Sequence, residues 1–411
     1  MLFTQESVHS PCLAMRAGIG TISGTSNGAC LVSCVANTFW QAALWIAAGA
    51  DNVSLATWFL FGKLIAAMIL VGFREKPSRE PFRQALSFCS MEDSFSQIPN
   101  SIEIRESLPR PKWDLIGSWV ESNIAPDSLD ESWLQIARDW LARLAHSLPL
   151  DYTVYESTEF LLLGADESLC KRVLNTAERA RRVILKTLDG VASELGYGKH
   201  VVLLFADVDS YYDYVSDFYS DEGEFALSGG LFVSVGYGHF AICPAYGDDY
   251  ERVIVHELNH ALLRHLPLPA WLDEGVTQVM EDVVLDSSYF MVDHEILRRH
   301  RAYWNADTID MFWSGAAFHS PDDGQELSYH LSQVLFRNLM SDYPRKVNDI
   351  LNNANFVDAG DAAFVASCNK SLAERASQFL GAGPWAPRSN YGLSDEKLRL
   401  DGVALTNRIG L

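Results

Sequence analysis

The most informative segment of the sequence is VIVHELNHALLRHLPLPAWLDEGVTQVMED, residues 253 to 282. Its first half places His256 and His260 four residues apart, so on a helix both imidazoles lie on one face, one turn apart, and can hold one metal ion. Glu257 follows the first histidine, where a general base for an activated water belongs. The alternative is a packed core helix, because apolar residues flank the motif on both sides. Histidines buried in such a helix would need other polar partners.

A third metal ligand is expected from the second half of the stretch. A catalytic zinc site uses three protein donors and keeps one position open. The segment LPLP ends the first helix, and a new amphipathic run follows it that contains Glu274. Glu281 and Asp282 lie further along the same run and are the alternatives to Glu274. The ligand count favours His256, His260 and Glu274 as the metal-binding set.

The segments HELNH and PAWLDEG together resemble the gluzincin metallopeptidases, in particular the peptidase MA-like branch of the thermolysin-like HExxH superfamily. The resemblance implies one Zn²⁺ per chain, bound by His256, His260 and Glu274, with Glu257 as general base and proton shuttle. It also implies hydrolysis of peptide bonds in a peptide or protein substrate. The interval between the second histidine and Glu274 is shorter here than in thermolysin.

The flanking sequence fits an α+β fold of this kind, a two-lobed zincin domain with a small mixed sheet and an active-site helix followed by an all-helical lobe. Apolar and amphipathic patterns predict, in chain order, a strand at 151–163, a helix at 170–196, a strand at 200–208 and two strands within 229–243. The resemblance implies that one strand of the sheet pairs with extended substrate. Phe240 to Cys243 is the candidate for that edge strand, and an internal strand without a substrate role is the alternative.

A helix predicted at 326–344 carries the candidates for a transition-state donor. Gluzincins place a tyrosine or histidine from this lobe against the developing oxyanion, where a donor in a dry site is effective. Tyr329 and His330 are neighbours, so only one of them can point inward. Tyr329 is preferred, and the alternative is that both lie on the helix surface.

The chain divides by composition into four parts. These are an apolar helical region at 1–73, a linker with amphipathic helices at 74–149, the peptidase-like domain at 150–385 and a loose tail at 386–411.

Two runs in the first part, 29–50 and 54–73, each approach the roughly 20 residues that cross a bilayer. Three interpretations remain open. They are a membrane hairpin with the catalytic domain in the cytosol, a single signal anchor with that domain outside, and helices of a soluble cytoplasmic protein, which Lys63 in mid-run favours.

Charge and cysteine content narrow the partners. A formal charge of -21 argues against nucleic-acid binding, which needs clustered basic residues. Seven scattered cysteines indicate neither a disulfide framework nor a sulfur zinc site. The acidic segment 207–222 lacks calcium-loop spacing and is interpreted as a solvated loop.

The sequence and the resemblance together favour a zinc peptidase, and the absence of an aminopeptidase G-x-M-E-N motif favours an endopeptidase. The alternatives are a catalytically silent scaffold that binds a peptide or protein, and a membrane-anchored interaction protein.

Overall fold

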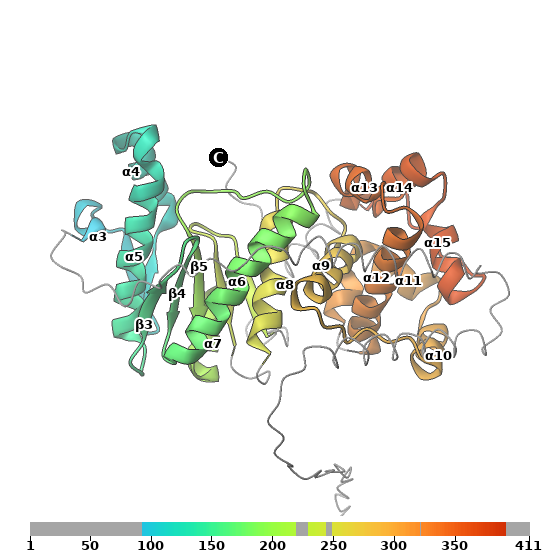
Figure 1. Ribbon diagram of the computed structural model, residues 1–411, viewed down its shortest axis with the longest axis horizontal. Helices are drawn as coiled ribbons and strands as arrows, with labels where there is room; N and C mark the ends of the chain where they lie inside the picture. Colours follow the sequence, from blue (N-terminus) through green and yellow to red (C-terminus); the bar gives the residue numbers. More distant parts are fainter. Residues whose placement is uncertain (1–92, 219–228, 244–248, 321, 392–411) are drawn as a thin grey trace, which may run out of the picture. The chain divides into compact units, whose positions relative to one another are not determined.

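The computed structural model describes residues 93–218, 229–243, 249–320 and 322–391 (Figure 1). All of them belong to one compact unit, Ser78–Leu411. The apolar region 1–73 with its predicted membrane segments lies outside the described residues, as do 74–92 and 392–411. Within the described ranges, no helix is both long and apolar enough to span a bilayer.

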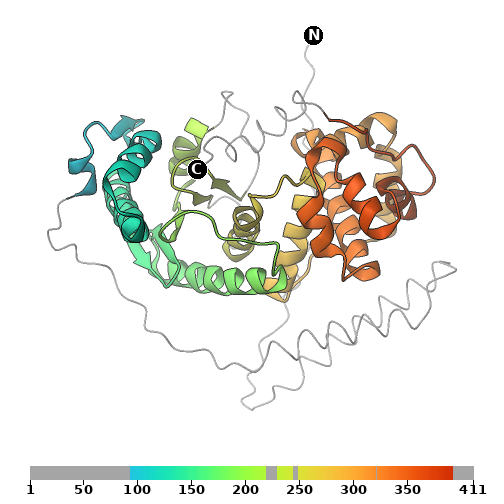
Figure 2. The same ribbon diagram turned by 90° about the horizontal axis from the view of Figure 1, so that it is seen from above.

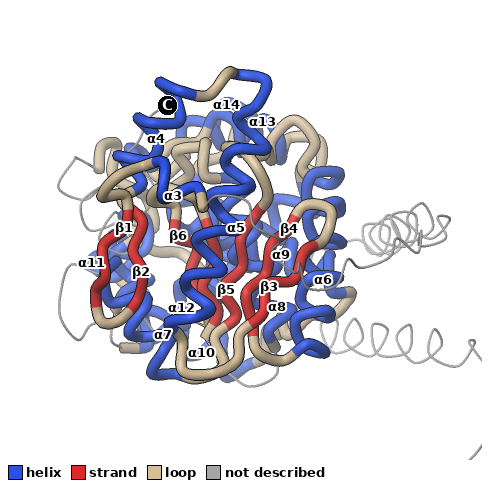
Figure 3. Tube along the Cα trace, turned by 90° about the vertical axis from the view of Figure 1, so that its left-hand side faces the viewer, coloured by secondary structure: helices blue, strands red, loops and turns tan. Residues whose placement is uncertain are grey.

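The described residues form the predicted α+β fold, built on a five-stranded mixed sheet. The strand order is β3-β4-β5-β7-β6. Figure 3 shows the strands in red with helices around them. Strands β4, β5 and β7 run parallel to one another, whereas β3 and β6 are antiparallel to their neighbours. The strands are β3 (Thr153–Glu156), β4 (Phe160–Gly164), β5 (His200–Leu204), β6 (Gly230–Val233) and β7 (His239–Ile242).

The segment 151–163, predicted as one strand, forms the β3–β4 hairpin instead. The backbone N–H of Ser157 donates a hydrogen bond to the carbonyl of Phe160 (2.9 Å), which reverses the chain within three residues. No glycine or proline marks this turn, so the apolar pattern on its two sides reads as continuous.

Both faces of the sheet are covered, because alternate residues of the central strands point to two separate cores. Leu162, Val202 and Phe240 belong to the core that contains α6 (Glu167–Thr187) and α8 (Tyr250–Leu263). Leu161 and Val201 belong to the core on the opposite face. Helix α8, which carries His256 and His260, therefore rests on a sheet that is covered on its other face as well.

The opposite face is covered by residues 93–149 together with Tyr211 and Tyr214, which come later in the chain. Residues 93–149 contain α3 (Ser94–Gln97), β1 (Ile102–Arg105), β2 (Leu108–Pro111), α4 (Trp113–Asn123) and α5 (Leu129–Ser147). Trp113 packs against Trp133, Trp140 and Tyr237, and Trp133 also packs against Tyr237, with ring centroids 5.2 to 6.4 Å apart. These tryptophans are packing anchors of this face.

The structure decides two sequence interpretations. Phe240 to Cys243 is not the edge strand, and the alternative of an internal strand is confirmed, because β7 lies between β5 and β6 and the outer strand is β6. The acidic segment is not wholly a solvated loop, since Val208–Val215 forms helix α7. Tyr211 and Tyr214 of α7 are buried in the core on the face opposite α8, and their spacing of three residues is that of a helix face.

The helices after α8 form the second part of the fold and lie at the opposite end from α4 and α5 (Figure 2). The pair α9 and α12 packs closely at its centre, where a Cβ on Gly275 would lie 2.8 Å from the carbonyl oxygen of Ser332. Trp385 and Tyr391 are buried at the end of the described chain. The helices are α9 (Ala270–Leu285), α10 (His294–Tyr303), α11 (Ala306–Ser314), α12 (Asp323–Asp342), α13 (Val347–Asn353), α14 (Asp361–Cys368) and α15 (Leu372–Leu380).

Candidate metal centre

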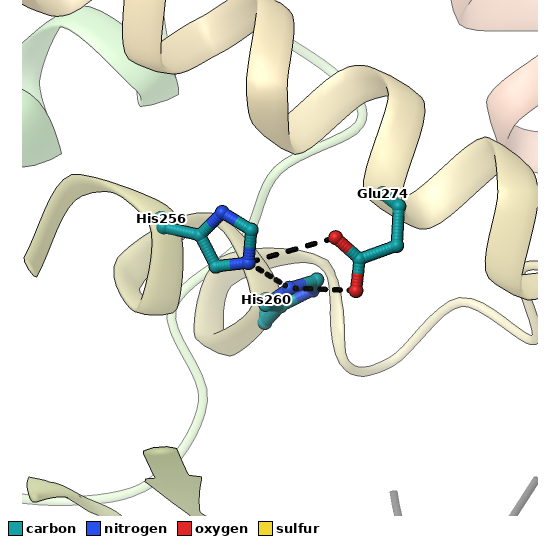
Figure 4. Close-up of side chains that lie close together, drawn as sticks. All are labelled: His256, His260 and Glu274. Carbon is teal, nitrogen blue, oxygen red and sulfur yellow. Dashed lines mark hydrogen bonds and ion pairs between the residues drawn. The ribbon is translucent and has the colours of Figure 1, made fainter. Parts of the chain in front are cut away.

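Helices α8 and α9 bring the three predicted metal ligands together (Figure 4). His256 and His260 lie one turn apart on α8, and the Nε2 atoms of their rings are 3.1 Å from each other. Each Nε2 atom lies 3.5 Å from a carboxylate oxygen of Glu274 on α9. Donors bound to tetrahedral zinc at about 2.0 to 2.2 Å lie about 3.3 Å from one another. The spacing of the three side chains therefore fits one zinc ion.

A carboxylate lies behind each histidine. The Nδ1 atom of His256 lies 2.6 Å from Oε1 of Glu281, and the Nδ1 atom of His260 lies 3.1 Å from Oδ2 of Asp273. Since a carboxylate accepts hydrogen bonds, each Nδ1 carries a proton and donates it, which leaves Nε2 facing the shared point. This carboxylate–histidine arrangement orients metal-binding imidazoles and raises their basicity.

The sequence indicates no role for Asp273, and it indicates Glu281 only as an alternative metal ligand. A signal for Glu281 exists in its spacing, because it follows Glu274 by seven residues and so returns to the same face of α9 after two turns. Arg252, one turn before His256, was also missed. Its Nη1 donates to Oε2 of Glu281 (2.8 Å) and fixes the carboxylate that holds the histidine.

The electrostatics of the cluster favour a bound cation. Burial opposes a charge on His256, but the hydrogen bond to Glu281 and the charge of Glu274 outweigh it and raise the pKa to about 9. For His260, burial is likewise outweighed, here by Asp273 and Glu274, and its pKa rises to about 10. Burial raises the pKa of Glu274. Protons thus occupy the histidines at neutral pH, in the place that a divalent ion would take.

An oxygen of Glu274 without a hydrogen bond tests the fit. Oε2 of Glu274 is buried and makes no hydrogen bond to any described residue, and Nε2 of His256 lies 3.5 Å from it as an ion-pair partner. A buried carboxylate oxygen without a hydrogen bond is costly, and a metal ion at the shared point would satisfy it.

Glu257 lies beside the cluster and is held by the sheet. Its Oε2 accepts a hydrogen bond from the backbone N–H of Phe232 on β6 (2.9 Å), and the side chain is almost fully buried. This bond restrains Oε2, and none of the described residues makes a hydrogen bond to Oε1. The outer strand β6 thus positions the predicted general base, a contact that the sequence did not reveal.

The structure separates the two candidates on α12. Tyr329 is close enough to the cluster that the negative charge of Glu274, together with burial, raises its pKa well above the usual value, so its hydroxyl stays protonated. His330 is held elsewhere. Its Nε2 lies 3.0 Å from the carbonyl of Met291 and its Nδ1 lies 2.8 Å from Nε2 of His300.

Comparison with known proteins adds no identification. Neither a protein-family model nor a curated protein matches this chain. The interpretation of the site therefore rests on its geometry: a mixed α+β fold with one His-His-Glu cluster among the described residues that could hold a metal ion.

Proposed function

We propose that this protein is a zinc-dependent peptidase of the gluzincin type. The observation that carries the proposal is the convergence of His256, His260 and Glu274 at distances suited to one zinc ion. Glu257 next to this cluster supplies the base that peptide hydrolysis needs. The arrangement of the chain is consistent with a two-lobed zincin domain, in which the sheet with α6 and α8 is one lobe and the helices from α9 onward are the other.

Each residue has a distinct part in the proposed chemistry. Zinc, when bound, lowers the pKa of a coordinated water and polarises a carbonyl group. Glu257 takes one proton from the attacking water and delivers it to the nitrogen of the leaving amine, so the carboxylate is regenerated. Tyr329 donates its hydroxyl hydrogen to the carbonyl oxygen as negative charge develops there. The raised pKa of Tyr329 keeps that hydrogen in place at neutral pH.

The back-side carboxylates act on the metal ligands and not on the substrate. Glu281 and Asp273 fix the ring orientation of the two histidines, and Arg252 fixes Glu281. Their role is to hold the donor geometry before the metal arrives.

The first test is the zinc content of the full chain, measured by elemental mass spectrometry in the wild type and in Glu274→Ala. We expect about one zinc per wild-type chain and a large loss in the variant, because two histidines alone leave the site incomplete. A folded wild-type protein that binds no zinc would refute the proposed site.

The second test separates metal binding from turnover. Glu257→Gln keeps an oxygen that can accept from the N–H of Phe232, so the variant should retain zinc. We expect its cleavage of a blocked-peptide library, read by mass spectrometry, to fall by about 10²- to 10⁴-fold. Zinc binding in the wild type without any cleavage would rule out a peptidase.

A further inference from the structure

A cavity of about 410 Å³ lies beside the metal centre, between α9, α12 and the segment 289–296. We call it the side cavity. Its volume lies within the range of small-ligand sites. Glu281, which holds His256, lines the side cavity, and so does Tyr329. The cavity therefore adjoins the place where the proposed reaction occurs.

The lining carries an excess of negative charge. Among the described residues, the side cavity is lined by four carboxylates, those of Glu281, Asp282, Asp293 and Glu326, and by one guanidinium, that of Arg252. The guanidinium is already engaged, because its Nη1 lies 2.8 Å from Glu281 and 3.4 Å from Asp282. An anionic ligand group in this cavity would therefore be repelled, and a cationic ligand group would be attracted.

Two guanidiniums outside the lining reduce this excess without removing it. Arg337 pairs with Asp282, and Arg299 lies 2.6 Å from Glu326. With both counted, the carboxylates still outnumber the guanidiniums by one. Asp293 is exposed, and it accepts the N-cap hydrogen bond from the backbone N–H of Ile296 (2.8 Å).

The histidine in the lining does not add positive charge, because a hydrogen-bond relay fixes its protons. The indole of Trp304 can only donate, and it donates to Nδ1 of His300 (2.8 Å). The remaining proton of His300, on Nε2, is therefore donated to Nδ1 of His330 (2.8 Å). His330 then donates from Nε2 to the carbonyl of Met291, which can only accept (3.0 Å). Each ring thus carries one proton and is neutral.

The same relay anchors an apolar wall. Met291, held through its carbonyl, lines the side cavity together with Phe290 and Ile296. The ring of Phe290 is stacked on His330, with centroids 5.3 Å apart. Met291 is 62% exposed, which places an apolar side chain at the solvent boundary of the cavity. The lining thus combines an apolar wall with unbalanced carboxylates.

We propose that the side cavity binds a substrate side chain with an apolar stem and a terminal cation, that is, a lysine or arginine close to the scissile bond. The stem packs against Phe290, Met291 and Ile296, and the cation lies near Asp293 and Glu326. This inference rests on the proposed peptidase function, since it names the substrate class of the same site.

The test begins with the zinc-loaded wild-type chain and a pool of blocked peptides of mixed sequence. Mass spectrometry of the products reports which residues flank each cleaved bond. We expect lysine and arginine to be enriched at one position next to the cleavage site. A peptide from this set is then prepared with lysine, norleucine or glutamate at that position. Its binding to zinc-loaded Glu257→Gln is measured by fluorescence anisotropy, and we expect the lysine form to bind most tightly and the glutamate form least.

Charge-neutralising variants locate the preference in the cavity. Asp293→Asn keeps a side chain that caps α10, so the helix should persist. The double variant Asp293→Asn with Glu326→Gln should bind the lysine peptide over the norleucine peptide with a smaller ratio of affinities. Each lost carboxylate should reduce this ratio by about two- to fivefold, the size expected for a partly exposed ion pair. Asp286→Asn is the matched control, because Asp286 is exposed at the end of α9 and does not line the cavity. It should leave the preference unchanged.

The outcomes are distinguishable. Cleavage without enrichment of basic residues, equal binding of the three peptides, or an unchanged preference in the double variant would each overturn the assignment of the cavity and leave the peptidase function standing. If the zinc-loaded wild type cleaves no peptide of the pool, the peptidase function is refuted, and the subsite assignment with it.

Discussion

Replacing Glu281 with glutamine should change how zinc binding depends on pH. Glu281 contacts the face of His256 that points away from the metal, so Glu281→Gln removes a charge and leaves all three ligands in place. Two of the influences that raise the pKa of His256 come from Glu281, through its hydrogen bond and its charge, and the third is the charge of Glu274. The variant should therefore lower that pKa from about 9 toward the ordinary value.

The magnitude follows from proton competition. At about pH 7, two units below a pKa of about 9, roughly one His256 side chain in a hundred is free of the competing proton. This lowers the apparent zinc affinity of the wild type by about 100-fold, or about 3 kcal/mol. In Glu281→Gln the proton competes less with zinc for His256, but the histidine also loses the carboxylate that orients it, which lowers the zinc affinity by about 10- to 100-fold. Near neutral pH the weaker proton competition offsets this lower affinity. Above about pH 9 the wild-type histidine is also free of the proton, so only the lower affinity of the variant remains.

The assay is a competition titration of zinc against a chromophoric chelator at several pH values between about 7 and 10. The wild-type affinity should rise steeply with pH over this range, whereas the Glu281→Gln affinity should rise less and end about 10- to 100-fold weaker. Glu295→Gln, an exposed change of the same chemistry on α10, should match the wild type throughout. Parallel curves for the wild type and Glu281→Gln would refute the reasoning.

Three further predictions concern the oxyanion donor, the helix pair and the metal-free protein. Tyr329→Phe should lower kcat by about 10²- to 10³-fold and retain zinc. His330→Gln keeps a donor toward the Met291 carbonyl and should change kcat far less. Equal losses of kcat for the two variants in steady-state kinetics would contradict the assignment of Tyr329. Gly275→Ala should lower the unfolding free energy by about 1 to 3 kcal/mol, because the new methyl group meets α12 at 2.8 Å, and a denaturant melt that matches the wild type would contradict this. The raised pKa values of His256 and His260 add stability to the metal-free protein that is fully present below about pH 6.5 and is lost as the pH rises through about 9 to 10. The Tm of chelator-treated protein should fall over that interval, and a Tm that rises there would contradict the assignment.

The sequence predicted the candidate metal ligands because their signal is local. The spacing of His256 and His260 places both on one helix face, and a proline-containing break followed by a new helix makes Glu274 available. The structure brings these three side chains together. Their supporting carboxylates were harder to predict, because Asp273 and Glu281 gain a role only once α9 lies against α8.

The interpretations of β7 and of the acidic segment failed for a common physical reason. A fully buried strand and an outer strand both appear in sequence as short apolar runs, so the position of β7 inside the sheet could not be deduced from Phe240 to Cys243 alone. Likewise, the many acids around α7 obscured two tyrosines at helical spacing that pack into the core. In both cases tertiary packing, and not local composition, decides the outcome.

The two-sided burial of the sheet has a consequence for the production of the region with the candidate metal centre in isolation. A fragment that started at about residue 150, where the peptidase-like pattern begins, would lack α4 and α5. Leu161, Leu163, Val201 and Leu203 would then lose the cover of these helices on one side of the strands, where α7 would remain. Such a fragment should aggregate during expression, since an apolar sheet face without cover is a surface for self-association. A usable fragment must retain the chain from at least Asp93 onward, even though the earlier helices supply none of the proposed metal ligands.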